Sequence, residues 1–394
     1  MQTRWIRAVC GAAVLALAGC GEESPAASTR VPAAEAAPVV RAYVALVSAN
    51  YGEMVTTAEA LRTAVRAMLA APSAQTLAAA RQAWVAARVP YYQTEAYRFY
   101  GGPIDGPADN VEGRLNAWPL DENYLDYVTG VPMSGIIQNP TMYPSLARAQ
   151  LVTLNERGGE NNIATGWHAI EFLLWGQDTS VTGPGDRPHT DYVTGAGGTG
   201  GNVERRRQYL TEVTDQLVAD LTAVRDQWNA SSPNTYAARL IAGDSNVALR
   251  NMLRGMGALA GTELSGERLT VAYEERDQED EHDCFSDNTH NGIVNDAAGI
   301  QNVWLGRYGS VDGPGLDDLV RARNPALADR VTRELQEAVD DARAIPAPFD
   351  QAILGADSAP GRVRIRATID ALRRNGRSIV EVAAALGLSI TLDV

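Results

Sequence analysis

The stretch that most constrains this chain runs from residue 166 to 176 and reads Gly-Trp-His-Ala-Ile-Glu-Phe-Leu-Leu-Trp-Gly. Apolar residues recur around it at spacings of four, three and four, which places them on one face of a helix: Ile163, Trp167, Ile170 and Leu174. Large apolar side chains cover most of the remaining surface, and a helix that is apolar nearly all round is a buried helix. We therefore predict a buried helix over residues 162–175.

His168 and Glu171 lie three residues apart inside this predicted helix, on one side of it. A buried imidazole and a buried carboxylate need a partner, a proton or a cation, because burying an uncompensated charge is costly. Such a pair can place two ligands on one metal ion. The alternative is a hydrogen-bonded pair that joins two helices and binds no ligand.

A second cluster is the acidic run of residues 274–283, which is followed by Cys-Phe-Ser-Asp-Asn-Thr-His at residues 284–290. If a helix of residues 266–283 continues through the run, its polar residues share one face: Glu275, Gln278, Glu279 and His282. Acidic runs are usually solvated surface. This one ends beside two of the four histidines of the chain.

Three residues of this second cluster are therefore candidates for the same pocket as His168: His282, Ser286 and Asp287. For Asp287 a purely structural role is also open. Asp287 or Asn288 is equally suited to be the N-cap of a helix that starts near His290.

Two further carboxylates precede the buried helix. Glu95 lies in an aromatic-rich helical stretch, where an unpaired carboxylate would be costly, and it is the candidate third metal ligand. Its alternative is an ion pair with Arg88 or Arg98. Asp105 is a pocket candidate in a Gly-Pro-Ile-Asp loop, where it could equally be a turn residue.

Helical periodicity dominates the rest of the chain, and no stretch longer than a few residues alternates as a strand should. We predict an all-α fold of two antiparallel bundles of the four-helix type, residues 38–200 and 201–394. The polar, glycine-rich residues 178–201 mark the break between them. Each half has a long helix that becomes charged before an irregular loop, which hints at an internal duplication.

The first residues are typical of a lipoprotein signal peptide, predicted over residues 1–19. Two arginines precede an apolar run at residues 8–18 that is too short to span a bilayer. Leu-Ala-Gly-Cys then matches a lipobox, so we expect Cys20 to carry lipid. Residues 20–37 are predicted to be a tether, because Ala, Glu, Ser and Pro bury no core. We expect an anchor in the outer membrane that faces the periplasm.

The charge and the missing motifs exclude several classes of protein. The formal net charge is −14 and all 34 basic residues are arginine, which makes nucleic acid a poor partner. The sequence has no His-Glu-x-x-His motif, no Gly-x-Ser-x-Gly motif and no P-loop. It also lacks the Cys-x-x-Cys-His motif that attaches haem covalently.

Taken together, the motifs resemble the imelysin family, also described as iron-regulated protein A-like. The G-x-H-x-x-E motif of that family is matched by Gly166, His168 and Glu171. The resemblance covers roughly residues 38 to 390 and includes other stretches in the expected order: Trp84 to Glu95, Ile104-Asp105, Trp118-Pro119-Leu120, Ser265-Gly266-Glu267 and Glu279 to His290.

The resemblance implies two helical bundles with a site between them near the G-x-H-x-x-E helix, in a cell-envelope protein linked to iron acquisition. Our first hypothesis is a lipid-anchored periplasmic protein that binds iron or an iron chelate for uptake. Its metal ligands would be His168 and Glu171, with Glu95 or an acid of the second cluster as the third. Outer-membrane or periplasmic iron-uptake components would be its partners. Oxygen and imidazole ligands suit iron better than a thiolate site would.

The family has also been classed as metallopeptidases, which gives a second hypothesis. In it, Glu171 or Glu95 would be the general base for a water bound to zinc. No helix of the chain offers the usual two histidines and a base for this chemistry. A third hypothesis is a helical binding protein without metal, whose buried His168–Glu171 pair is structural.

Overall fold

The computed structural model describes residues 30–106 and 111–392. The predicted signal peptide and Cys20 lie outside the described residues. The first helix begins at Ala33, so it takes up the last part of the tether expected over residues 20–37. Val31, just before it, is buried, and its amide nitrogen donates to the Asn246 side chain at 3.1 Å.

The fold is all-α, as predicted, and its regular β-structure within the described residues is one hairpin of two short strands. The helices and strands have the following bounds: α1 Ala33–Ala70, α2 Ala74–Thr94, η1 Glu95–Tyr97, α3 Val111–Leu115, α4 Glu122–Leu125, α5 Gly135–Gln138, α6 Arg148–Leu154, α7 Gly166–Trp175, η2 His189–Tyr192, α8 Val203–Gln227, α9 Tyr236–Ala242, α10 Ser245–Ala258, η3 Leu259–Thr270, α11 Val271–Glu275, η4 Gln278–Asp280, α12 Thr289–Leu305, β1 Arg307–Tyr308, β2 Val311–Asp312, α13 Leu316–Arg321, α14 Pro325–Arg343, α15 Phe349–Ala352 and α16 Pro360–Ala385.

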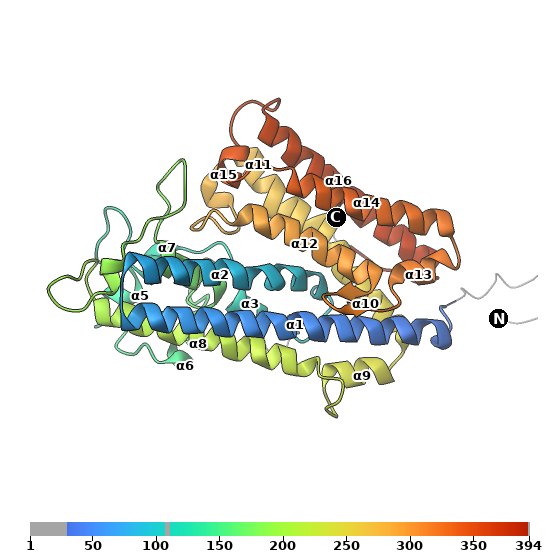
Figure 1. Cartoon of the computed structure of the whole chain (residues 1–394), viewed down its shortest axis with the longest axis horizontal. Coiled ribbons are helices and arrows are strands. Elements are labelled where there is room, and N and C mark those ends of the chain that lie inside the picture. The colour runs from blue at the N-terminus through green and yellow to red at the C-terminus, as the bar shows by residue number, and fades with distance from the viewer. Residues whose placement is uncertain (1–29, 107–110, 393–394) are drawn as a thin grey trace, which may run out of the picture.

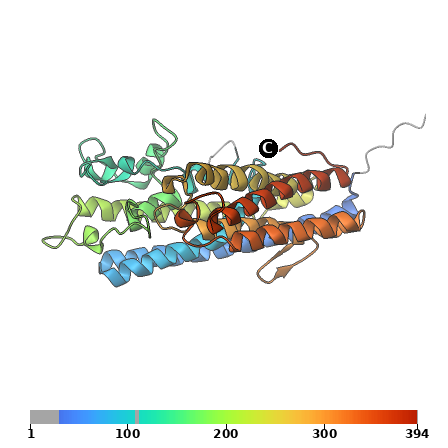
Figure 2. The same cartoon turned by 90° about the horizontal axis from the view of Figure 1, so that it is seen from above.

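The long helices form two groups along the long axis of the molecule (Figure 1). The first group contains α1, α2 and α8, with α7 packed between α2 and α8. The second contains α10, η3, α12, α14 and α16, and the two groups meet where α12 packs on α2 and α10 packs on α1. Seen from above, the long helices follow the same elongated direction (Figure 2).

The predicted boundary at residues 200 and 201 falls between α7 and α8, which pack together. Helix α8 also packs on α1, so the structure places it with the first group although it follows the glycine-rich break in sequence. No helix within residues 30–106 and 111–392 has both the length and the hydrophobicity needed to cross a lipid bilayer.

Local sequence explains the hairpin of α1 and α2. The chain breaks before Ser73, whose side chain accepts from the Thr76 amide at 3.1 Å while Thr76 caps Ser73 in return. Pro72-Ser73 in the sequence predicts a helix break followed by an N-cap, and the structure confirms both. A proline inside a helical pattern predicts a kink or an interruption, and the structure shows no interruption at Pro90, because α2 continues through it to Thr94. The Pro90 carbonyl accepts from the Asn50 side chain of α1 at 2.9 Å, which ties the two helices together there.

The predicted helix of residues 266–283 is wrong in its second half. Residues 259–270 form a π-helix, η3, and the chain then leaves helical conformation after Glu275. Arg276 adopts the left-handed conformation with φ 57°, a conformation that ends helices. Residues 278 and 282 therefore do not share a helix face with Glu275, and His282 lies in a turn.

A buried ion network joins α4, α5, η2 and α8 at one end of the first group. The carboxylate of Asp126 accepts from Arg206 at 2.6 Å and from Arg187 at 2.9 Å, and Gln138 donates to its other oxygen at 2.7 Å. Asp126, Arg187 and Arg206 are all buried. Arg187 also pairs with Asp191 at 2.9 Å, whereas Arg206 has Asp126 as its carboxylate partner. The loss of the Asp126 charge would therefore leave the buried Arg206 guanidinium without its ion pair and weaken that of Arg187.

We therefore expect Asp126→Asn to lower the free energy of unfolding by about 3–5 kcal/mol, the cost of breaking a buried ion pair. Urea unfolding followed by circular dichroism measures this change. The control is Asp370→Asn, which removes the exposed Arg366–Asp370 pair of α16 and should cost about 1 kcal/mol or less. Equal effects of the two substitutions would contradict the importance of the Asp126 network.

Candidate metal centre

Helix α7 is buried at every position, as predicted, although it begins at Gly166 rather than at residue 162. Gly166 has φ 86°, and a Cβ built on it would lie 2.4 Å from the Leu115 carbonyl oxygen. Only glycine tolerates both conditions. The glycine of the G-x-H-x-x-E motif therefore lets α7 start directly against α3, which fixes the depth at which His168 and Glu171 sit.

Helix α2 presents a row of residues four apart toward α7: Trp84, Arg88 and Tyr92. The Trp84 indole nitrogen donates to the Trp167 carbonyl oxygen at 3.1 Å and so fixes the two helices against each other. The guanidinium of Arg88 lies 4.3 Å from the ring centre of Tyr92 and 5.5 Å from that of Trp167. Stacking on aromatic faces stabilises this cation where water cannot reach it.

The loop between η4 and α12 brings Asp283 to this row. One carboxylate oxygen of Asp283 accepts from Arg88 at 2.8 Å, and the other accepts from the Tyr92 hydroxyl at 2.5 Å. The amide nitrogen of Asp283 donates to the Thr289 hydroxyl at 3.1 Å. Asp283 is fully buried, and although burial raises its pKa, the Arg88 charge holds the pKa well below its usual range.

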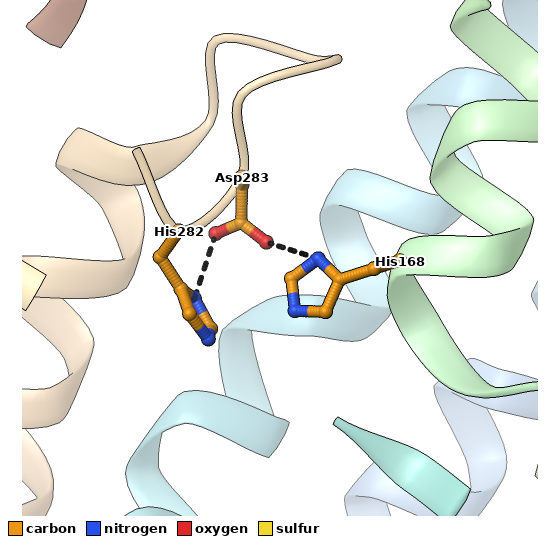
Figure 3. Close-up of side chains that lie close together, drawn as sticks. All are labelled: His168, His282 and Asp283. Carbon is orange, nitrogen blue, oxygen red and sulfur yellow. Dashed lines mark ion pairs between the residues drawn. The ribbon is translucent and has the colours of Figure 1, made fainter. Parts of the chain in front are cut away.

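His168, His282 and Asp283 converge from α7 and from this loop (Figure 3). The Nδ1 atom of His168 lies 3.8 Å from one Asp283 oxygen, and the Nδ1 atom of His282 lies 3.6 Å from the other. The two imidazole rings meet edge to face, with 4.7 Å between their centres. Among the described residues, these three form the one group of His, Cys, Asp or Glu whose ligand atoms all lie within 4.8 Å of one another.

Both imidazoles are neutral at ordinary pH, the form that binds metal. Burial, followed by the charges of His282 and Arg88, keeps the pKa of His168 well below its usual value. Burial, followed by the charge of Arg268, lowers the pKa of His282 to about 4.

Glu171 lies one turn after His168 and supports it. Its Oε2 atom is 3.1 Å from His168 Nδ1, while its Oε1 atom accepts from the Ser286 amide at 3.0 Å and from the Ser286 hydroxyl at 2.6 Å. Burial and the nearby charge of Asp283 raise the pKa of Glu171 well above its usual value. Ser286, a predicted pocket residue, therefore reaches the site through Glu171.

The donor atoms fit a metal ion in one specific way. His168 Nε2 is buried without a hydrogen-bond partner, and it lies on the side of the ring that faces His282 (Figure 3). With Nδ1 occupied by Glu171, Nε2 is the nitrogen left for a ligand. A metal-binding histidine usually has its other nitrogen held by a carboxylate in this manner.

Two other predicted residues lie in different surroundings. Glu95 is buried and accepts from Arg98 and from Arg268, each at 2.5 Å. Although burial raises its pKa, these two arginines lower it to about 2. The ion-pair alternative with Arg98 therefore describes Glu95, which the structure does not bring into the histidine group.

Asp105 is a turn residue, the second of the two roles that the sequence allowed for it. Its carboxylate accepts from the backbone amides of Phe99 at 2.5 Å and Gly102 at 2.7 Å, which closes the loop after η1.

Asn288, rather than Asp287, occupies the N-cap position of α12. Asp287 has φ 54°, and its pKa is raised to about 7 by burial and by the charges of Asp350 and Asp178.

Asp283 belongs to the acidic run that was expected to offer a ligand, but it was not singled out from that run, and Arg88 was considered only as a partner for Glu95. The signal for Asp283 was its position beside His282 in the acidic run. The signal for Arg88 was its spacing of four from Trp84 and Tyr92, which places a cation on an aromatic helix face.

Comparisons with known proteins agree with these motifs. The imelysin family model matches residues 47–379 of this chain. Iron-regulated protein A of Synechococcus elongatus is 24% identical over 310 residues, which cover 76% of this chain and 73% of that protein.

Two crystal structures share the fold. That of an iron-regulated protein A precursor from Parabacteroides distasonis has a TM-score of 0.70 at 20% identity, and the match covers 91% of this chain and 96% of that chain. That of an imelysin-like protein from Psychrobacter arcticum has a TM-score of 0.64 at 13% identity, and the match covers 92% and 99%.

Near the centre, Glu122 gives the stability of the protein a measurable pH dependence. Burial and the charges of Glu279, Asp121 and Asp178 raise its pKa to about 7. Since an unfolded glutamate has a pKa of about 4.3, the folded state holds the extra proton between these values and loses stability as pH rises through them. Glu122→Gln should therefore raise the melting temperature at pH 8 and leave it unchanged at pH 4.

The glutamine can still accept from Gln177, which donates to Glu122 at 3.0 Å, so the comparison isolates the charge. Differential scanning calorimetry at the two pH values measures the effect. The same shift at both pH values would show that the carboxyl proton is not its cause.

Proposed function

The chain belongs to the imelysin family, and on that premise we propose that it binds iron, as an ion or a chelate, for uptake across the cell envelope. His168, His282 and Asp283 are the proposed ligands. The observation that carries the proposal is the buried, unpartnered Nε2 atom of His168 beside a second imidazole and a carboxylate. Two imidazoles and one carboxylate form a donor set that suits ferrous iron.

This proposal changes the ligand set expected from the sequence. Glu171 orients His168 through Nδ1, and its other oxygen is taken by Ser286. Glu95 belongs to the ion pairs with Arg98 and Arg268. Asp283 supplies the carboxylate ligand in their place.

Arg88 favours a carrier over a permanent metal site. Its guanidinium lies 2.8 Å from Asp283 and 3.4 Å from His282 Nδ1. A bound cation would feel this charge at short range, which weakens its affinity. The same guanidinium keeps Asp283 paired when no metal is bound. A protein that delivers its cargo needs both properties.

Metal also requires a path to the ligands. His168 is almost completely buried, and its ring lies against that of His282 in the loop of residues 281–288. Polar contacts hold this loop through Asp283, which pairs with Arg88 and Tyr92, and through Ser286, which donates to Glu171. Phe285 of the loop also packs on Phe172, with 5.2 Å between the ring centres. We propose that uptake and release proceed by local opening of this loop.

A zinc peptidase is the alternative function. It needs a carboxylate free to take a proton from a metal-bound water. Both oxygens of Glu171 already have partners. Glu95 keeps its Oε1 atom without a partner, but it is ion-paired with Arg98 and Arg268 and lies outside the histidine group. The geometry therefore favours binding. Cleavage of a denatured protein by the metal-loaded chain, lost in Glu171→Gln, would establish the peptidase instead.

The location of the protein is part of the proposal and rests on its sequence. A lipid on Cys20 would anchor the chain to the outer membrane, facing the periplasm, and place the site near envelope components of iron uptake. Mass spectrometry of the mature N-terminus tests the lipid directly.

We expect His168→Ala and His282→Ala each to abolish binding of ferrous iron, because each removes one of three ligands. Anaerobic titration calorimetry with elemental analysis measures affinity and stoichiometry. The matched control is His189→Ala, which removes a half-buried histidine of η2 and should leave binding intact. Unchanged stoichiometry in the first two variants would refute the site.

Glu171→Gln separates an orienting residue from a ligand. Loss of an orienting carboxylate typically lowers metal affinity about 10- to 100-fold and keeps the stoichiometry. We expect this intermediate result in the same titration. Complete loss of binding in a folded variant would instead make Glu171 a ligand.

A further inference from the structure

A second group of buried carboxylates lies in and beside the loop of residues 281–288. Asp178, Glu281, Asp287 and Asp350 come from three separate segments and are each more than nine-tenths buried. Three contacts join these segments: Gln278 with the Asp178 carbonyl at 2.9 Å, Gly185 with the Phe285 carbonyl at 3.0 Å, and Gln351 with the Val181 carbonyl.

Four buried oxygens of this group have no hydrogen-bond partner. Both carboxylate oxygens of Glu281, one of Asp287 and one of Asp350 lack a hydrogen bond. Burial raises the pKa of Glu281 well above its usual value, and the nearby Thr289 hydroxyl offsets this only in part, since it makes no hydrogen bond of ordinary geometry with that carboxylate. Buried carboxylates are normally paired, since an unpaired one is costly.

The charges that act on each of these carboxylates come largely from the other carboxylates of the group. Burial raises the pKa of Asp287, and the charges of Asp350 and Asp178 raise it further. Burial also raises the pKa of Asp178, to which the charge of Asp350 adds. Arginines pair with the buried carboxylates of Glu95 and Asp126. A bound cation would have the same effect on the carboxylates here.

We propose that Glu281, Asp287 and Asp350, with Asp178 beside them, form a second cation site that takes a hard divalent cation with part of its water shell. Oxygen-only ligands select calcium, magnesium or manganese over metals that prefer nitrogen or sulfur. The four carboxylates are less closely gathered than the histidine group. Retained water molecules therefore bridge the cation to some of them.

The site differs from the proposed iron site in ligands and in consequence. Glu281 and Asp287 lie in the loop of residues 281–288, whereas Asp350 lies in α15 of the second helix group. A cation held between them fastens the loop to α15 and opposes its opening. Occupancy of this site thus stabilises the closed form of the histidine centre.

Manganese is a suitable probe, because its free aquo ion has an electron paramagnetic resonance signal that disappears on binding. The purified full chain carrying His168→Ala is titrated with manganese chloride, so that the histidine centre is disabled. We expect one manganese ion per chain. Adding Asp350→Asn should weaken binding at least tenfold, whereas adding Asp312→Asn, at an exposed aspartate of β2, should not.

Thermal unfolding gives a second reading in the wild-type chain. Calcium should raise the melting temperature, and this rise should be lost in both Asp350→Asn and Glu281→Gln. Without calcium, both variants should be at least as stable as the wild type, because a like charge has been removed. Manganese binding that is absent in His168→Ala, or unaffected by Asp350→Asn, would overturn the proposal without bearing on iron at His168.

Discussion

The carboxylate of Asp283 connects the parts of this molecule that make its centre. Arg88 and Tyr92 of α2 hold its two oxygens, and the residue before it, His282, is thereby placed against His168 of α7. The loop of residues 281–288 is also held to the first helix group by Ser286 on Glu171 and by Phe285 on Phe172, but the Asp283 contact is the one that positions His282. A buried ion pair is expensive to desolvate, so its presence here is explained better by the position it imposes than by net stability.

The boundary between the two helix groups is polar at its centre, which is unusual for the inside of a helical protein. Next to the Arg88–Asp283 pair, Arg268 of η3 joins Glu95 to Asp296 of α12. The charge of Arg268 also lowers the pKa of His282, so the two clusters act on each other. The π-helix carries this arginine, in keeping with the frequent occurrence of such helices at functional sites.

Sequence periodicity was sufficient for the all-α class, for the buried helix around His168 and for the cap at Ser73, because these depend on local spacing. Periodicity failed where contacts between residues far apart in sequence determine the conformation or the partners of a residue. The run from Glu274 to Asp283 looks helical, yet the chain turns at Arg276 and gains the contacts of Asp283 and Ser286. The partners of Glu95 could be only partly foreseen, since Arg268 lies 173 residues away in sequence.

The central claim is that a metal ion sits between His168, His282 and Asp283. Anomalous diffraction at the iron edge, from crystals soaked anaerobically with ferrous iron, tests it most directly. The account predicts one strong peak at about 2.0–2.3 Å from His168 Nε2, a metal–ligand distance, with Glu171 still on Nδ1. An iron peak found only at other residues, with no density within bonding distance of His168 Nε2, would contradict it.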